Sequence, residues 1–326
     1  MDAVGIEDIE IVVPKCFGET NKDLEEIHGF DPSFIRDKLG IRSRSVLCEG
    51  QSPSDLAVLA TEKLLRPHED RLGKIELVIV VTQTSDLYLP HVAAIVHGAL
   101  MLPKNVMAFD IGLGCSGYVT GLQVAKAVMN SEGFANGLLI TVDAYSRIVD
   151  KSDRATAPIF GDAATATLLS RRPCYWLGRA VSGTDGSKHK CLIAGRETDN
   201  RLRMDGRAIF DFMMREVPTS IEACLRLNGL NIEQIDAFIF HQASRYMLRA
   251  LSSTLKIDSK RLIEDFADIG NTTSSSIPIA LKRVLLNGDH RPEKILLCGF
   301  GVGLSWGSTV IIRSEKRGGE SEETFG

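Results

Sequence analysis

Apolar runs rich in β-branched residues recur along the chain and alternate with segments of helical period. Five of these runs predict buried strands, at residues 75–82, 106–111, 137–142, 235–240 and 295–299. Helical patterns lie between them, for example at 117–129 and 277–286. Continuous apolar strands that alternate with helices are typical of α/β proteins, so we expect buried, largely parallel sheets.

The pattern also repeats within the chain. Phe109-Asp-Ile-Gly112 and Ala267-Asp-Ile-Gly270 are each followed by small residues and then by a helical segment. The strands that begin at Ile75 and Ile235 precede these motifs at similar distances, and similar strands follow them. Three matches in the same order predict two similar α/β halves, roughly 1–172 and 173–326. Functional sites often form where such halves meet.

Two segments fall outside this pattern. Residues 183–203 are polar and contain glycine, which predicts a connecting loop or a lid. The charged tail from Ser314 onward has few apolar residues, so we expect it to be disordered.

Composition narrows the class of protein. The chain has 326 residues, of which 44% are hydrophobic and 25% charged, with a net charge of −4. These values favour a globular protein and disfavour a nucleic-acid or membrane partner. The start of the chain lacks a signal-peptide pattern, and no apolar stretch reaches about 18 residues. Seven cysteines without a CxxC pair argue against a disulfide framework or a zinc cluster, so we expect a cytoplasmic protein with reduced thiols.

The segment Asp110-Ile-Gly-Leu-Gly-Cys-Ser-Gly117 lies between a predicted strand and a predicted helix. It satisfies GxGxxG through Gly112, Gly114 and Gly117, and Asp143 follows the next strand. A dinucleotide site of an NAD(P)-dependent oxidoreductase is therefore one interpretation. A cysteine inside the glycine loop is not what the approach of a pyrophosphate requires.

The competing interpretation makes Cys115 a nucleophile at the start of a helix. The helix dipole and unpaired N–H groups would favour the thiolate and lower the pKa of the thiol. Small neighbours would allow a sharp turn and the approach of a substrate, and the Cys115 N–H could hold an oxyanion. A buried structural cysteine is the alternative, and the motif alone does not decide between them.

Two polar residues of the second half strengthen the nucleophile hypothesis. His241 follows the strand at 235–240, where side chains face the usual α/β crevice. Asn271 occupies the repeat position near that of Cys115, although it could instead cap a helix. The repeat places the two loops opposite each other, so Cys115 could face His241 and Asn271. The glycine-rich turn Cys298–Gly307 requires close backbone packing or supplies an N–H donor.

Together these motifs resemble the thiolase superfamily, and within it the β-ketoacyl-acyl-carrier-protein synthase III group. The resemblance covers nearly the whole chain, and the Cys, His and Asn motifs in this order are highly specific. The matching segments are Thr20–Leu24 with Lys38–Arg42, Asp110–Tyr118, Ser152–Ala155 with Phe160–Asp162, Met204–Arg207 with Phe210, His241–Ala243, Gly270–Thr272 and Gly299–Gly307.

The resemblance implies a duplicated, five-layered α-β-α-β-α fold, an obligate homodimer and a ping-pong reaction without a cofactor or metal. Cys115 would take an acyl group from acyl-CoA, with the N–H groups of Cys115 and Val302 as the oxyanion hole. Malonyl-carrier protein would then bind and lose CO₂. His241 and Asn271 would hydrogen-bond to the enolate oxygen, since paired donors suit a developing enolate better than one base does.

Further substrate contacts follow from positions in the family pattern. Arg154 matches an arginine that stacks on the CoA adenine, and Phe34 replaces its usual tryptophan partner. Leu89 matches a residue lent across the dimer to the neighbour's acyl pocket. Phe160 matches a pocket wall, Met204 adds to the apolar pocket, and Phe300 matches the aromatic residue beside the catalytic groups.

The chain departs from the family pattern on its carrier-binding face. Asp211 and Tyr246 replace the usual lysine and arginine, and Ser244 replaces an asparagine. Arg245 and Arg249 lie nearby and could compensate. Because charges of this kind hold an acidic carrier, the usual carrier-protein partner is in doubt.

Several functions therefore remain open at this stage. The first is a condensing enzyme of fatty-acid initiation, and the second is a specialised-metabolite acyltransferase with a different carbon, nitrogen or oxygen acceptor. An NAD(P)-dependent oxidoreductase, a non-catalytic homologue and a thioesterase are further alternatives. The sequence sets neither the acyl-chain length nor the identity of the acceptor.

Overall fold

The computed structural model describes residues 4–15, 18–286 and 291–314. Within them, nine strands form one hydrogen-bonded sheet in the order β11-β12-β13-β8-β1-β7-β6-β4-β5. Their bounds are Gly5–Val12 for β1, Leu77–Val81 for β4, Met107–Ile111 for β5, Asn136–Asp143 for β6, Ala163–Ser170 for β7, Tyr175–Thr184 for β8, Ala237–Phe240 for β11, Lys294–Gly301 for β12 and Ser305–Arg313 for β13.

The five predicted strands correspond to β4, β5, β6, β11 and β12, so their placement is confirmed. The expectation of largely parallel sheets is wrong. Only β4 with β5, β4 with β6 and β11 with β12 pair in parallel, whereas the other neighbours in the sheet are antiparallel. The reason is local for β12 and β13, since residues 302–304 join them and only antiparallel strands can be joined by so short a turn.

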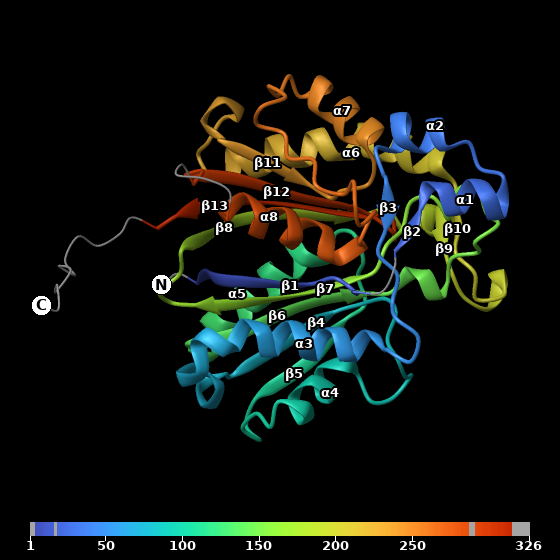
Figure 1. The fold of residues 1–326 in the computed structure, drawn as a ribbon. Helices are drawn as coiled ribbons and strands as arrows, with labels where there is room; N and C mark the ends of the chain where they lie inside the picture. The colour runs from blue at the N-terminus through green and yellow to red at the C-terminus, as the bar shows by residue number, and fades with distance from the viewer. Residues whose placement is uncertain (1–3, 16–17, 287–290, 315–326) are drawn as a thin grey trace, which may run out of the picture.

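Three layers of helices alternate with the two parts of this sheet, so the molecule has five layers (Figure 1). On one outer face, α3 (Pro53–Leu65) and α4 (Val92–Ala99) cover the β5-to-β1 part. On the other, α6 (Gly206–Leu227) covers β8, β12 and β13, with α7 (Arg245–Thr254) beside it. The middle layer contains α5 (Gly117–Glu132) and α8 (Ser276–Leu286), which contact strands of both parts. The predicted α-β-α-β-α fold is confirmed.

The internal repeat is visible in the strand order. The first part reads β5-β4-β6-β7-β1, and the second reads β11-β12-β13-β8. A parallel bridge between Phe238 and Leu262 stands where the second part would have its counterpart of β5. The two parts join through a short antiparallel pairing of Gly5 and Ile6 with β8. The exact division at residues 172 and 173 stays a prediction.

Short elements surround one end of the sheet. Near the N-terminus lie β2 (Glu19–Thr20), α1 (Asn21–His28), α2 (Pro32–Phe34), a π-helical turn (Ile35–Leu39) and β3 (Ser43–Arg44). The predicted loop at 183–203 contains two 3-10 turns and the strand β9 (Leu192–Ile193), which pairs with β10 (Arg203–Met204). The segment is therefore more ordered than a simple loop, because this small sheet fixes its ends.

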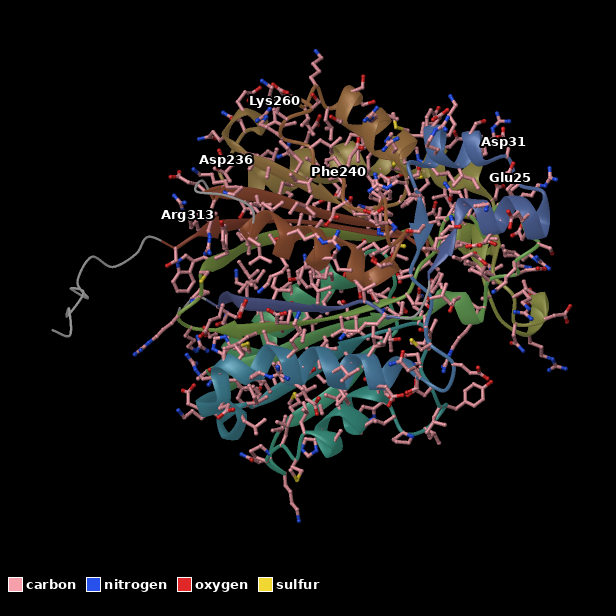
Figure 2. All side chains as sticks on the ribbon, viewed as in Figure 1. Glu25, Asp31, Asp236, Phe240, Lys260 and Arg313 are labelled. Atoms are coloured by element: carbon pink, nitrogen blue, oxygen red, sulfur yellow. The ribbon has the colours of Figure 1, made fainter. Side chains whose placement is uncertain are left out.

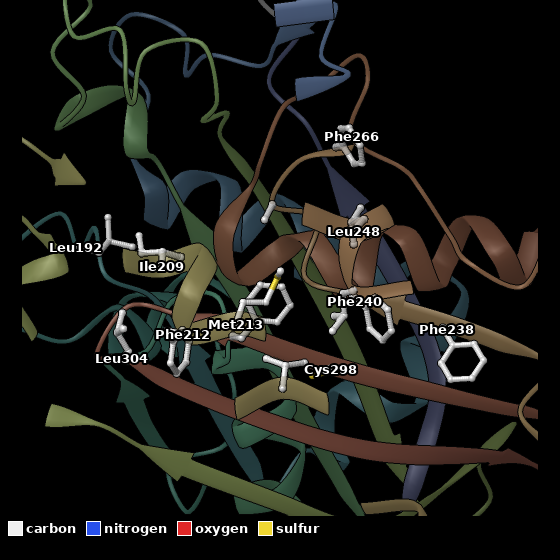
Figure 3. Packing of buried hydrophobic residues seen from close by; sticks show 14 of the residues in the cluster. Leu192, Ile209, Phe212, Met213, Phe238, Phe240, Leu248, Phe266, Cys298 and Leu304 are labelled. Carbon is white, nitrogen blue, oxygen red and sulfur yellow. The ribbon is translucent and has the colours of Figure 1, made fainter. Parts of the chain in front are cut away.

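Charged side chains such as those of Glu25, Asp31 and Lys260 lie on the outside, whereas Phe240 points into the interior (Figure 2). The largest apolar cluster fills the space between α6, α7 and the β11–β12 face. Figure 3 shows part of it, including Phe212, Met213 and Cys298. Burial of this apolar surface is the main driving force that holds α6 and α7 on the sheet.

The cysteines and the C-terminal tail were predicted from the sequence to be reduced and disordered, respectively. Five described cysteines are free, but Cys48 is disulfide-bonded, so the expectation of uniformly reduced thiols is wrong at that residue. The predicted disordered tail lies outside the described residues except for Ser314. No helix within the described part of the chain is long and apolar enough to cross a bilayer.

Candidate active site

A cavity of about 560 Å³ brings together residues from distant parts of the sequence. Cys115, His241 and Asn271 all line it, so the structure assembles the three predicted catalytic residues in one place. The remaining walls are mostly apolar. They comprise Phe34, Lys38, Leu39, Ile159, Phe160, Leu192, Met204, Gly206, Arg207, Ile209, Phe210, Ala243, Ser244, Tyr246, Met247, Phe300 and Gly301. A concave, largely apolar space with a few converging polar groups is typical of a small-molecule site.

Cys115 lies between the end of β5 and the first turn of α5, as the sequence predicts. Its side chain is 4% exposed. The glycine-rich turn of the second half packs directly against it, because a Cβ on Gly299 would lie 2.4 Å from the Cys115 oxygen. A Cβ on Gly301 would lie 2.8 Å from the Cys115 sulfur. The predicted need for close backbone packing at this turn is therefore confirmed.

The expected lowering of the thiol pKa is wrong for this structure. Burial raises the pKa of Cys115 to about 12, and the nearby charge of Asp143 raises it further. Hydrogen bonds from the backbone N–H groups of Val302 and Cys115 act in the opposite direction but do not outweigh burial. Cys115 is thus a protonated thiol at neutral pH, and two N–H donors converge on its sulfur.

His241 follows β11 and is 2% exposed. Its Nδ1 lies 2.8 Å from Ser276 Oγ, and the Ser276 hydroxyl donates to the Thr273 oxygen at 2.9 Å. With the single hydroxyl hydrogen on the Thr273 oxygen, Nδ1 donates to Ser276, and Nε2 carries a lone pair. Burial lowers the pKa of His241 to about 3, so the imidazole is neutral.

Asn271 lies beside His241, with its Nδ2 atom 3.2 Å from His241 Nε2. Its Oδ1 accepts from the Thr273 N–H at 2.9 Å, and its backbone N–H donates to the Ile159 oxygen at 2.8 Å. The helix that follows, α8, begins only at Ser276. Asn271 is therefore not the cap of that helix, and its amide nitrogen is directed to the site.

Asp143 organises the loop that carries Asn271. Its carboxylate accepts from Thr273 Oγ1 at 2.7 Å, from the Ser274 hydroxyl and N–H, and from the Gln83 N–H at 2.8 Å. The residue is fully buried, and burial raises its pKa to about 6. The sequence pointed to Asp143 only as part of a dinucleotide site, whereas its partners are Gln83 of the same half and Thr273 and Ser274 of the other half.

The same arrangement removes the basis for the dinucleotide interpretation. The Asp143 carboxylate is already occupied by hydroxyl and amide donors of the protein. Two glycines of the loop serve protein packing, because a Cβ on Gly114 would lie 2.2 Å from Gln83 Oε1 and one on Gly117 would lie 2.4 Å from Val81. The Asp143 carboxylate is therefore not free to hold a ribose, and Gly114 and Gly117 are packed against the protein instead of facing a pyrophosphate.

The remaining predicted residues fall into two groups. Phe34, Phe160, Met204 and Phe300 line the cavity, and the Phe300 ring meets the His241 ring edge-on, with centroids 5.8 Å apart. Arg154 and Leu89 are not among the lining residues. Their roles as a CoA contact and a lent pocket residue stay predictions.

Arg154 lies beside another aromatic ring, and Leu89 lies on the surface. The Arg154 guanidinium lies 5.9 Å from the ring centroid of Phe30, whereas Phe34 is the aromatic residue that lines the cavity. Leu89 is 85% exposed on the loop between β4 and α4.

Sequence reasoning missed three residues of the site. Ser276 lies in a serine run with no distinctive signal, and its role depends on the geometry of His241. Lys38 and Arg207 also line the cavity. Both belong to segments that carry the family resemblance, and their positive charge is the signal that could have identified them. Within the described residues, no group of three potential metal ligands lies close enough to hold an ion.

Comparison with known proteins agrees with this geometry. The family described as "3-Oxoacyl-[acyl-carrier-protein (ACP)] synthase III" matches residues 109–186, and its C-terminal part matches 225–312. "Beta-ketoacyl-[acyl-carrier-protein] synthase III" of Streptococcus equi subsp. zooepidemicus is 34% identical over 307 residues, which cover 90% of this chain and 94% of that one. The enzyme of that name from Streptococcus mutans is also 34% identical, over 311 residues and with the same coverage.

Solved structures give the same result. The β-ketoacyl-ACP synthase III of Thermus thermophilus superposes with a TM-score of 0.89 at 34% identity, covering 95% of this chain and 99% of that one. The corresponding enzyme of Pseudomonas aeruginosa also gives 0.89, at 28% identity and with 96% and 99% coverage. The chain belongs to the 3-oxoacyl-acyl-carrier-protein synthase III family of condensing acyltransferases.

Proposed function

We propose that this protein forms an acyl thioester on Cys115 and condenses it decarboxylatively with a malonyl thioester. The observation that carries the proposal is the convergence of Cys115, His241 and Asn271 on one largely apolar cavity. A thiol, a neutral imidazole and an amide donor are the groups that acyl transfer and enolate stabilisation require.

In the first half-reaction the Cys115 sulfur attacks the carbonyl carbon of an acyl-CoA. The thiol is protonated, so its proton must be removed, and the neutral His241 with a lone pair on Nε2 is the base available in the cavity. The N–H groups of Cys115 and Val302 hydrogen-bond to the Cys115 sulfur, so they are close enough to hold an oxyanion that forms on the carbon bound to it. The tetrahedral intermediate then expels the CoA thiolate, which takes the proton from His241 and leaves as CoA.

In the second half-reaction the malonyl carboxylate leaves as CO₂ and an enolate forms. Asn271 Nδ2 and His241 Nε2 are adjacent, so both can reach one enolate oxygen. His241 must then donate from Nε2, which requires its proton to move from Nδ1. Ser276 permits this change, because its hydroxyl can turn from the Thr273 oxygen to Nδ1. The carbanion attacks the acyl carbon and releases Cys115, which regains a proton.

The proposal includes a homodimer that acts in the cytoplasm without a cofactor or metal. Strand β5 is the last strand of the sheet, so one of its edges has no neighbour among the described strands. Large exposed apolar side chains lie on nearby segments, namely Leu87, Tyr88, Leu89, Met101 and Met107. An exposed edge next to an apolar surface favours pairing with a second copy, which could bring Leu89 to the neighbouring site.

Intact-mass spectrometry after incubation with a panel of acyl-CoAs tests the first half-reaction. We expect one acyl group to be added to the wild-type protein and none to Cys115→Ala. Cys174→Ala is the matched control, because Cys174 is exposed and lies outside the cavity. Absence of an adduct with every acyl-CoA and acyl-carrier donor would overturn the proposal.

A further inference from the structure

The opening of the cavity has a distinctive chemistry. Five of its lining residues, Phe34, Lys38, Arg207, Phe210 and Tyr246, form what we call the mouth. Phe34 and Tyr246 are 52% and 55% exposed, and the rings of Tyr246 and Phe210 stack with centroids 5.3 Å apart. Exposed aromatic faces of this kind suit a flat aromatic ligand.

The two cations of the mouth are available to a ligand. Lys38 and Arg207 form no salt bridge with any other residue that the structure describes. Both are exposed, so they can meet phosphate groups without loss of an internal ion pair. Cationic and aromatic side chains together match coenzyme A, which combines phosphates with an adenine ring.

Three arginines near the mouth are paired with carboxylates of the protein itself. Glu264 pairs with Arg249 at 2.8 Å and with Arg245 at 3.4 Å, and so occupies both arginines at the start of α7. Arg36 is paired with Asp37 at 2.8 Å. These three arginines therefore offer an acidic partner less attraction than unpaired arginines would.

Asp211 adds a further exposed carboxylate, next to Phe210 on α6. It forms no salt bridge within the part of the chain that the structure describes. An acidic carrier protein that docks with its prosthetic arm in the cavity would rest on these surroundings. It would meet repulsion from Asp211 and little attraction from the paired arginines.

We propose, on the basis of the condensing function above, that the malonyl-type substrate is a coenzyme A thioester rather than one bound to a carrier protein. Both half-reactions then use the same mouth. The acyl group on Cys115 is joined to the two-carbon unit of malonyl-CoA, whose carboxylate leaves as CO₂. The products are a 3-oxoacyl-CoA and the Cys115 thiol, which regains a proton from solvent by way of His241.

The test compares malonyl-CoA with a purified malonyl-loaded acyl carrier protein on enzyme first acylated with acetyl-CoA. The kcat/KM for malonyl-CoA should exceed that for the carrier by about tenfold or more. Glu264→Gln keeps the side-chain shape but releases both arginines. It should raise kcat/KM for the carrier on the order of threefold to tenfold at low salt, and leave malonyl-CoA within about twofold.

Two further variants sharpen the comparison. Tyr246→Arg replaces an aromatic residue of the mouth with a cation, so it should raise the ratio of kcat/KM for the carrier to that for malonyl-CoA, as Glu264→Gln does. Glu293→Gln is the matched control, because it breaks the exposed ion pair with Arg313. Arg313 lies at the opposite edge of the molecule from Asp31, which precedes α2 and Phe34 (Figure 2). This control should leave kcat/KM unchanged for both malonyl-CoA and the malonyl-loaded carrier.

Equal use of the two substrates, or a preference for the carrier, would overturn the inference. An equal effect of Glu264→Gln on both substrates would overturn it as well. A binding measurement separates this outcome from failure of the proposed function. If neither substrate condenses, the condensing function fails, and the Kd values of Cys115→Ala for malonyl-CoA and the malonyl-loaded carrier still show which one the mouth selects.

Discussion

The amide nitrogen of Asn271 lies 3.2 Å from Nε2 of His241, although 30 residues separate them in the sequence. His241 comes from the end of β11, and Asn271 from a loop that Asp143 holds by hydrogen bonds to Thr273 and Ser274. The pair therefore depends on contacts between both halves of the chain. The amide of Asn271 and the imidazole of His241 are close enough to hydrogen-bond to the same enolate oxygen.

The first prediction separates the two half-reactions. Asn271→Ala should retain most of the self-acylation of Cys115, because Asn271 acts on the enolate and not on the thiol. Decarboxylative condensation should fall on the order of 100-fold, as expected for loss of one preorganised donor. Single-turnover acylation and CO₂ release measure the two steps, and normal condensation by Asn271→Ala would disprove the enolate assignment.

The second prediction concerns Ser276, which contacts His241 and does not line the cavity. Ser276→Ala removes the partner of Nδ1, so the two neutral tautomers of His241 should change in population. We expect a change in the ¹⁵N shifts of this imidazole and a fall in condensation of roughly tenfold. Ser276→Thr keeps a hydroxyl and should restore part of the activity. Unchanged ¹⁵N shifts in Ser276→Ala would contradict the assigned hydrogen bond.

The third prediction follows from the raised pKa of Cys115, which is about 12. Only the thiolate reacts with iodoacetamide, so below this pKa the alkylation rate should rise about tenfold for each pH unit. The rise should continue from pH 7 to pH 10 without a plateau. Peptide mapping distinguishes Cys115 from the other cysteines, and a plateau below pH 9 would show that the thiol is more acidic than the structure indicates.

Asp143 provides an independent check on that pKa. Its negative charge raises the pKa of Cys115, so Asp143→Asn should lower it. At pH 8 the variant should be alkylated roughly threefold faster. Glu25→Gln, an exposed change on α1, should have no effect. Slower alkylation of Asp143→Asn in a protein with an unchanged circular-dichroism spectrum would show that the sign of the interaction is wrong.

The fourth prediction uses the close contact between Gly301 and Cys115. A Cβ at residue 301 would lie 2.8 Å from the Cys115 sulfur, where an acyl group and its oxyanion must form. Gly301→Ala should therefore slow self-acylation by on the order of 100-fold. Gly186→Ala is the matched control, because a Cβ there meets no atom within 4 Å. Rapid acylation of Gly301→Ala would contradict the packing of this turn.

The sequence predicted most of the fold because its signals are local. Apolar runs located the strands β4, β5, β6, β11 and β12, and the repeat indicated two similar parts. The relative direction of two strands depends on which strands pair in the folded sheet, and a local apolar run does not show this. The antiparallel pairs of β1, β7, β8 and β13 were therefore missed. The short β9–β10 pair lies in a polar segment with no strand pattern and was missed for the same reason.

The site could be predicted as far as its residues carry distinctive motifs. Cys115, His241 and Asn271 occupy such motifs, and they do line one cavity. The pKa of Cys115 could not be predicted, because it depends on burial beneath a turn more than 180 residues away in the sequence. Asp143 depends likewise on Thr273 and Ser274 from the other half, and Ser276 depends on His241, 35 residues away in the sequence. The pairing of Glu264 with two arginines of α7 appears only once the chain is folded.

The most direct test of the account is a chase of acetylated protein with a malonyl thioester. Protein acylated from acetyl-CoA is freed of excess donor and mixed with malonyl-CoA or the malonyl-loaded carrier, and mass spectrometry follows Cys115 and the product together. We predict loss of the acetyl group from Cys115, matched by equimolar CO₂ and a 3-oxoacyl thioester. Release of the acetyl group as free acetate, without that product, would contradict the condensing function.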